Sequence, residues 1–94
     1  SRAADVPLAT AEVGAAVAEL AAGLAIAGNP DLRGDATTAV NLAESATAAA
    51  TDLVARNLRA ADLEDERTER AQALADRAWA ARERVVRLER DPAG

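Results

Sequence analysis

Apolar residues recur at spacings of three and four along most of the chain, a periodicity that predicts amphipathic helices. A clear stripe is formed by Val13, Val17, Leu20 and Leu24. A second periodic segment is rich in alanine, and a third carries a heptad-like seam of Ala71, Leu74, Ala78, Ala81, Val85 and Leu88. The alternating pattern typical of strands is not found. The sequence therefore predicts an all-α fold.

Proline and glycine indicate where the helices begin and end. Pro7 suits the first position of a helix, where its missing N–H costs nothing. Gly28, with Pro30 just beyond it, is a typical helix stop. We expect one domain over residues 1–94, containing three long helices at about residues 7–27, 32–58 and 63–90.

The middle helix has an acidic start and an alanine-rich body. Asp31, Gly34 or Asp35 is expected to cap it, and a carboxylate there complements the helix dipole. Small side chains on nearly every face let neighbouring helices approach closely. We therefore expect this helix to be the most buried of the three.

Composition restricts the chemistry open to the chain. The 94 residues include no histidine and no cysteine, and the net charge is −5. All the cationic side chains are arginine, so a Schiff-base lysine is excluded, and acid–base work falls to Asp, Glu or Arg. We expect no metal site. The acidic balance and the lack of a basic stripe argue against nucleic-acid binding.

The expected core is thin, because alanine buries little area and Trp79 is the only aromatic residue. Three such helices would leave an apolar face uncovered. We therefore expect part of an antiparallel helical bundle, completed by a missing N-terminal half, by a homodimer partner, or by both.

The longest apolar run, residues 13–28, is interrupted by Glu19 and rich in alanine, so we do not expect it to span a membrane. No signal peptide is recognisable. The cytoplasm is the expected location. Because the chain begins at Ser1 and has no methionine, we expect a processed product or a piece of a longer protein.

Three short motifs carry a family resemblance: Gly-Asn-Pro-Asp at residues 28–31, Gly-Asp-Ala at 34–36, and Asn57-Leu58. In this order and spacing, over roughly residues 6–90, the chain resembles the cyclodeaminase/cyclohydrolase family of folate one-carbon enzymes. That family typically has Gly-Asn-Pro-Asn, then Ser/Thr-Asp-Ala, then Asn-Val-x-x-Asn-Leu. Asp31 and Gly34 depart from the pattern, as does Thr37. The resemblance covers only the C-terminal half of such a domain, without its Pro-Gly-Gly-Gly-Ser segment.

The resemblance implies a function as formiminotetrahydrofolate cyclodeaminase or as methenyltetrahydrofolate cyclohydrolase. The substrate would be a tetrahydrofolate derivative, with no metal, and the enzyme would be a dimer. The catalytic candidate is Asp35, suited to stabilising charge or orienting substrate rather than to abstracting a proton. The candidates for binding the reduced folate are Asn29, Asp35, Asn57 and Arg33.

Each candidate also has a purely structural interpretation. Asn29 suits an ordinary turn, and Asp35 a first-turn carboxylate that stabilises its helix. Asn57 would link two helices through its side-chain amide, and Arg33 would be a solvated cation on the surface. The alternative function is accordingly a non-catalytic helical module for dimerisation or assembly. In that case the heptad-like seam of the third helix and the alanine-rich middle helix serve association only.

Overall fold

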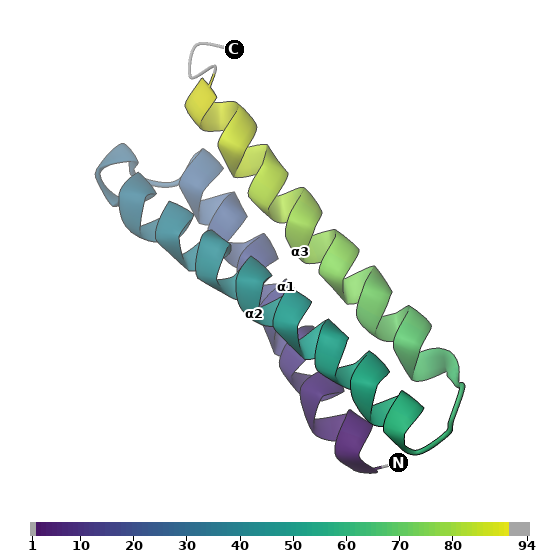
Figure 1. Cartoon of the computed structure of the whole chain (residues 1–94). Helices are drawn as coiled ribbons and strands as arrows, with labels where there is room; N and C mark the ends of the chain where they lie inside the picture. The colour runs from purple at the N-terminus through teal and green to yellow at the C-terminus, as the bar shows by residue number, and fades with distance from the viewer. Residues whose placement is uncertain (1, 91–94) are drawn as a thin grey trace.

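The computed structural model describes residues 2–90, which form three long α-helices and one short 3-10 helix. These are α1 (Arg2–Ala27), η1 (Pro30–Leu32), α2 (Arg33–Ala60) and α3 (Glu66–Arg90). The long helices lie side by side in a body about 50 Å long and 19 Å wide. The N terminus and the α2–α3 connection lie at one end, and the α1–α2 turn and the end of α3 lie at the other (Figure 1). The predicted all-α, three-helix fold is confirmed for the described residues.

Helix α1 packs through its small residues. Its buried face consists of Ala4, Pro7, Ala11, Gly14, Ala15, Ala18, Ala21, Ala22 and Ala25. Its large apolar residues are on the outside: Val13 is 64% exposed, Leu20 67% and Leu24 58%. The stripe predicted from the sequence therefore exists, but it faces away from the core.

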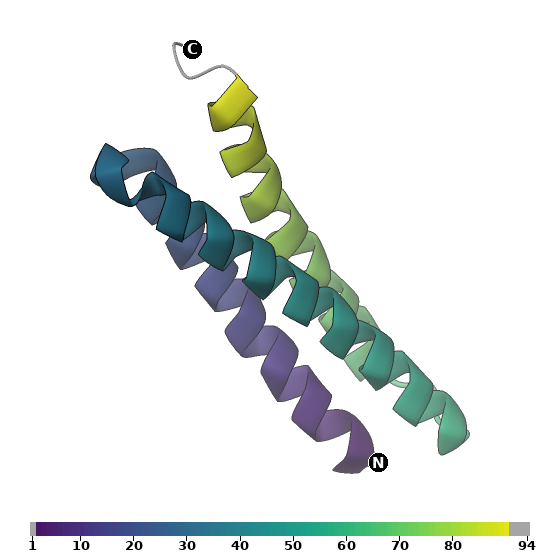
Figure 2. The same ribbon diagram turned by 60° about the vertical axis from the view of Figure 1, so that its left-hand side comes forward.

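Glycine at position 14 brings α1 and α2 close together. A Cβ at Gly14 would overlap Oγ1 of Thr47, which is fully buried and donates a 2.7 Å hydrogen bond to the Ala43 carbonyl. Figures 1 and 2 show the two helices running alongside each other from the α1–α2 turn. The expectation that α2 is the most buried helix is wrong, because α1 buries more of its residues, presenting small side chains to both neighbours.

Pro7 does not begin α1 but lies, buried, inside it. An interior proline lacks the N–H that would bond to the carbonyl four residues earlier, here that of Ala3. The side chain of Asn57 donates to this carbonyl, with Nδ2 2.6 Å from the oxygen. A contact from α2 thus supports the turn of α1 in which the proline sits.

The connection between α2 and α3 is longer than predicted, because it includes residues 63–65, which the sequence prediction assigned to the third helix. Asp62 has a φ of 55°, Asp62 N–H bonds to the Arg59 carbonyl, and Leu63 N–H bonds to the Leu58 carbonyl. This is a Schellman motif, with Leu63 and Leu58 at the two positions that commonly make its apolar contact. Helix α3 begins at Glu66. The side chain of the preceding residue, Asp65, accepts a 2.8 Å hydrogen bond from the Arg67 N–H in its first turn.

Along α3 the predicted seam faces the core. Ala71, Leu74, Ala78, Ala81 and Val85 are buried, and Leu88 is partly buried. Two ion pairs connect α3 to α1, one between Arg67 and Asp5 and one between Arg77 and Glu19. Exposed pairs of this kind stabilise a fold by at most about 1 kcal/mol each. They add polar contacts at the edge of an interface in which alanines of α1 pack with Leu74 and Val85 of α3.

By length and composition alone, α1 is apolar enough to cross a membrane, with a mean hydropathy of 1.5 over an 18-residue window. A buried core helix passes the same test. Here α1 keeps its alanine face packed within the bundle.

Candidate functional site

The α1–α2 turn is built around Asn29. Its side-chain oxygen accepts a 2.9 Å hydrogen bond from the Asp31 N–H, and its backbone carbonyl accepts one from the Leu32 N–H. Asn29 thereby caps η1, whose first residue is Pro30. This is ordinary Asx-turn chemistry, and it uses the amide oxygen while leaving the amide NH₂ exposed.

Two further residues close the end of α1. Gly28 donates its N–H to the Leu24 carbonyl at 2.8 Å, and a side chain at Gly28 would collide with that carbonyl. Arg33 donates from Nε to the Ala25 carbonyl at 3.2 Å. A guanidinium there satisfies a terminal carbonyl and complements the negative end of the helix. Arg33 therefore has a structural role at the end of α1. This bond uses Nε and does not involve the two terminal nitrogens of the guanidinium.

Asn29 and Asp35 line the same groove, which has a volume of about 320 Å³. The rest of its lining is apolar or glycine: Ala21, Leu24, Gly28, Leu32, Ala36 and Ala39. Asp35 is exposed, and within residues 2–90 its side chain makes no hydrogen bond or ion pair. The groove thus combines an apolar wall with one free carboxylate and one amide, the mixture that small-molecule sites commonly have.

The start of α2 lies beside this groove and has no side-chain cap. Leu32 occupies the N-cap position, where its side chain makes no capping hydrogen bond. The prediction that Asp31, Gly34 or Asp35 caps the helix is therefore wrong, because η1 replaces the cap with a tight 3-10 turn. Uncapped N–H groups at a helix start attract anions and polar ligand edges.

Asn57 lies at the other end of the molecule. It is 22 residues from Asp35 on the same helix, which at 1.5 Å per residue is about 33 Å. Its side chain binds the Ala3 carbonyl, as described above. Within one chain, the structure brings together Asn29 and Asp35, with Arg33 in the same turn, but not Asn57.

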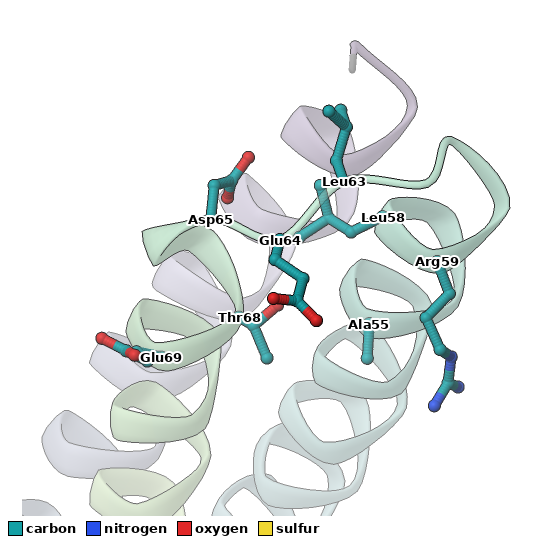
Figure 3. A pocket seen from close by; sticks show the side chains of 8 residues that line it. All are labelled: Ala55, Leu58, Arg59, Leu63, Glu64, Asp65, Thr68 and Glu69. Carbon is teal, nitrogen blue, oxygen red and sulfur yellow. The ribbon is translucent and has the colours of Figure 1, made fainter.

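A second hollow lies between the end of α2 and the start of α3, with a volume of about 360 Å³ (Figure 3). Its polar lining consists of Glu64, Asp65, Glu69, Thr68 and Arg59. Glu64 extends over it from the connection between the helices. Hydrogen bonds from Arg67 lower the pKa of Asp65 to about 2, so this carboxylate stays charged. Charged and polar side chains make up most of this lining, whereas the groove at the α1–α2 turn combines a mainly apolar wall with two polar groups, as small-molecule sites commonly do, which makes the groove the better candidate.

The comparison with protein families identifies the class of protein. Residues 1–81 match the family model described as formiminotransferase-cyclodeaminase. The chain therefore belongs to the formiminotransferase-cyclodeaminase family, as its turn and its Asn57-Leu58 motif suggested. Searches of the curated proteins and of the solved structures found no match.

The sequence motifs located the polar residues of the groove but not its walls. Ala21, Ala36 and Ala39 are ordinary members of alanine-rich helices, and nothing in their spacing separates them from alanines that do not line the groove. Leu24 and Leu32 flank the turn at either side. Large apolar residues next to an Asn-Pro turn are the one sequence signal that points to an apolar wall there.

Proposed function

We propose that this chain is part of a folate-dependent one-carbon enzyme and that it binds a reduced folate in the groove at the α1–α2 turn. The observation that carries the proposal is the placement of Asn29 and Asp35 on one apolar groove of about 320 Å³. Membership of the formiminotransferase-cyclodeaminase family supports the same substrate class.

The chemistry of a reduced folate matches this groove. A pterin ring is flat and has adjacent N–H donors on one edge. A carboxylate accepts two such donors at once, and charge-assisted pairs of this kind are among the stronger hydrogen bonds. Asp35 would accept them, Asn29 would donate from its amide NH₂, and Leu24 and Leu32 would pack on the ring.

Two reactions fit. A cyclodeaminase closes formiminotetrahydrofolate to the methenyl form with loss of ammonia, and a cyclohydrolase adds water to the methenyl form to give the formyl form. Both act on a cationic one-carbon group and pass through a tetrahedral carbon. The carboxylate of Asp35 has no cationic partner within residues 2–90, so it is free to stabilise that positive charge.

Ligand binding is the direct test. The melting temperature is measured with and without tetrahydrofolate, for the wild-type chain, for Asp35→Asn and for Asp31→Asn. A ligand at one hundred times its dissociation constant adds about 2.7 kcal/mol to stability. We expect Asp35→Asn to weaken binding at least about tenfold, since hydrogen bonds to charged groups contribute about 1.5–3 kcal/mol each.

Asp31 is the matched control, because it is exposed in the same turn and does not line the groove. Asp31→Asn should bind as the wild type does. No change in melting temperature with saturating folate, in any of the three chains, refutes the proposed function.

The second candidate is a non-catalytic module for helical association. It is favoured by the exposed apolar stripe of α1, because monomeric soluble proteins rarely leave a continuous apolar surface of this kind uncovered. A homodimer or a complementary N-terminal segment would cover it. Association and folate binding are compatible, so the thermal shift decides whether the groove has a ligand as well.

A further inference from the structure

The first turns of α2, residues 33–40, carry Asp35 but have little support from their own sequence. Leu32 makes no side-chain cap at the N-cap position, and Gly34 lies in the first turn, where glycine is unfavourable. Thr37 and Thr38 follow, and β-branched residues have a lower helix propensity than alanine. We call residues 33–40 the α2 start. Contacts from the rest of the bundle must hold it in its helical position.

Val85, near the end of α3, packs behind the wall of the groove. It is 1% exposed and belongs to one buried cluster with Val40 of α2. Ala36 and Ala39 pack against the same cluster, and both also line the groove at the α1–α2 turn. The two alanines thus connect the groove with the cluster that contains Val85.

Glu89, one turn beyond Val85, makes a second contact with the α2 start. Its Oε1 accepts a 3.1 Å hydrogen bond from Oγ1 of Thr37. A carboxylate in the last turn of a helix is disfavoured by the negative end of the helix dipole. Here α3 ends at the same end of the molecule at which α2 begins, and the positive end of α2 attracts that carboxylate (Figure 1). The location of Glu89 is therefore explained by its contact with α2 rather than by α3 alone.

The contact with Glu89 lies on the far side of α2 from the groove. An α-helix turns about 100° per residue, so Thr37, two residues after Asp35, projects from nearly the opposite side. Neither Thr37 nor Glu89 lines the groove. Their bond can therefore influence a ligand in the groove only through the position of the turn that carries Asp35.

The contact between Thr37 and Glu89 is not part of the family resemblance. The match to the family model ends at residue 81, so Val85 and Glu89 lie beyond the matched stretch. Thr37 is one of the positions at which the chain departs from the family pattern. The contact is thus a feature of this chain.

We propose that the last turns of α3 support the candidate site from behind, with Val85 and Glu89 acting as positioning residues for Asp35. Val85 supports the wall of the groove through the buried cluster, and Glu89 holds the α2 start through Thr37. Together they keep Asp35 and the apolar wall facing the same ligand. The role in folate binding rests on the proposed function, whereas the support of α2 by α3 does not.

The loss of one hydrogen bond sets the size of the expected effect. A typical bond changes an equilibrium by about two- to tenfold. Without it the α2 start opens more often, so the protection of its amides from hydrogen exchange should fall by that factor. The apparent dissociation constant of a ligand rises as the binding-competent fraction falls, so that for tetrahydrofolate should rise about twofold or more.

Amide hydrogen exchange followed by NMR tests the support without any ligand. Thr37→Val removes the donor at nearly constant shape, whereas Thr37→Ser keeps it. We expect the amides of residues 36–40 to lose protection about two- to tenfold relative to those of residues 50–54 in Thr37→Val, but not in Thr37→Ser. Glu89→Met, which has no acceptor oxygen, should resemble Thr37→Val, and Glu89→Gln, which keeps one, should resemble the wild type.

Thr51 provides the matched control for tetrahydrofolate binding, because its hydroxyl makes another bond from α2 to α3, to the Ala71 carbonyl at 3.1 Å. Thr51 is 16 residues from Asp35 on the same helix, about 24 Å. Thr51→Val should lower the melting temperature at least as much as Thr37→Val, yet leave the affinity for tetrahydrofolate unchanged. This difference separates a positioning role from a general loss of stability.

Two buried valines form a second matched pair. Val85 and Val54 are both at most 1% exposed, but Val54 belongs to a cluster that contains Ala4, at the other end of the molecule. Both Val85→Ala and Val54→Ala should lower the melting temperature. Only Val85→Ala should raise the dissociation constant for tetrahydrofolate, measured well below the melting transition.

Unchanged protection of residues 36–40 in Thr37→Val overturns the support of α2 by α3. Equal losses of affinity in Thr37→Val and Thr51→Val also overturn the positioning role, because they indicate a general loss of stability. If the wild type binds no tetrahydrofolate while protection falls as expected, the proposed function fails and the support of α2 stands. If the wild type and Thr37→Val bind it equally, the positioning role fails and the proposed function stands.

Discussion

The close contact between α1 and α2 at Gly14 gives a sharp prediction for Gly14→Ala. Replacing glycine by alanine inside an exposed helix usually stabilises it by about 1 kcal/mol. Here the new methyl group would overlap Thr47 Oγ1, which is bonded to the Ala43 carbonyl at 2.7 Å. Thr47 is fully buried, and rotating its side chain would break that bond.

The magnitude follows from the competing terms. Overpacking a core costs about 1–3 kcal/mol, and leaving a buried hydroxyl unpaired costs about 1–3 kcal/mol. The two costs sum to about 2–6 kcal/mol, and after the helix-propensity gain of about 1 kcal/mol is subtracted, we expect Gly14→Ala to lower the free energy of unfolding by about 1–5 kcal/mol. For a domain of this size, each kcal/mol lowers the melting temperature by about 4–8 °C. Urea denaturation and thermal melts followed by circular dichroism measure both quantities.

Gly23→Ala is the matched control, since Gly23 lies on the same helix with nothing within 4 Å of the new methyl position. It should stabilise the chain by up to about 1 kcal/mol. Adding Thr47→Ala to Gly14→Ala removes the overlap and should recover much of the loss. If Gly14→Ala is as stable as Gly23→Ala, the helices do not approach as closely as argued.

Three further predictions concern stability. Asp62→Gly should raise the free energy of unfolding by about 0.5–1 kcal/mol in urea denaturation, because Asp62 has a φ of 55° and glycine adopts such values without strain; Asp62→Ala should not. Arg67 lowers the pKa of Asp65 to about 2, below its unfolded value of about 4, so the stabilisation by this pair is present above about pH 4 and lost as the pH falls toward 2. Urea midpoints between pH 5 and 2 should therefore fall more steeply for the wild type than for Asp65→Asn, and parallel curves would contradict this. Leu74→Ala should cost about 2–5 kcal/mol, since Leu74 is only 1% exposed, and a smaller loss would indicate a core that collapses around the cavity.

The heptad seam of α3 was predictable from sequence because its larger residues, Leu74 and Val85, face inward as an amphipathic pattern implies. The orientation of α1 was not. Its largest residues mark one face and its alanines another, and a hydrophobicity pattern alone does not say which face meets α2 and α3. The decisive feature is Gly14, whose lack of a side chain admits Thr47.

The same contrast holds at the candidate site. The Asn-Pro turn and the acidic start of α2 are visible in the sequence, and the structure places Asn29 and Asp35 on one groove. Pro7 misled the prediction of where α1 begins, because the helix continues before the proline, where Asn57, a residue 50 positions further along the chain, donates to the Ala3 carbonyl. A pattern of neighbouring residues carries no information about a contact between residues so far apart in the sequence.

An interior of alanine has a consequence for how the chain keeps its shape. The side chains that would release most free energy on leaving water, among them Val13, Leu20 and Leu24, contribute little of it within a single molecule. A partner that covers these side chains binds the folded chain and not the unfolded one. Its binding free energy therefore adds to the stability of the folded state. The midpoint of unfolding should then climb as this partner becomes more abundant, so that folding and assembly act as one reaction.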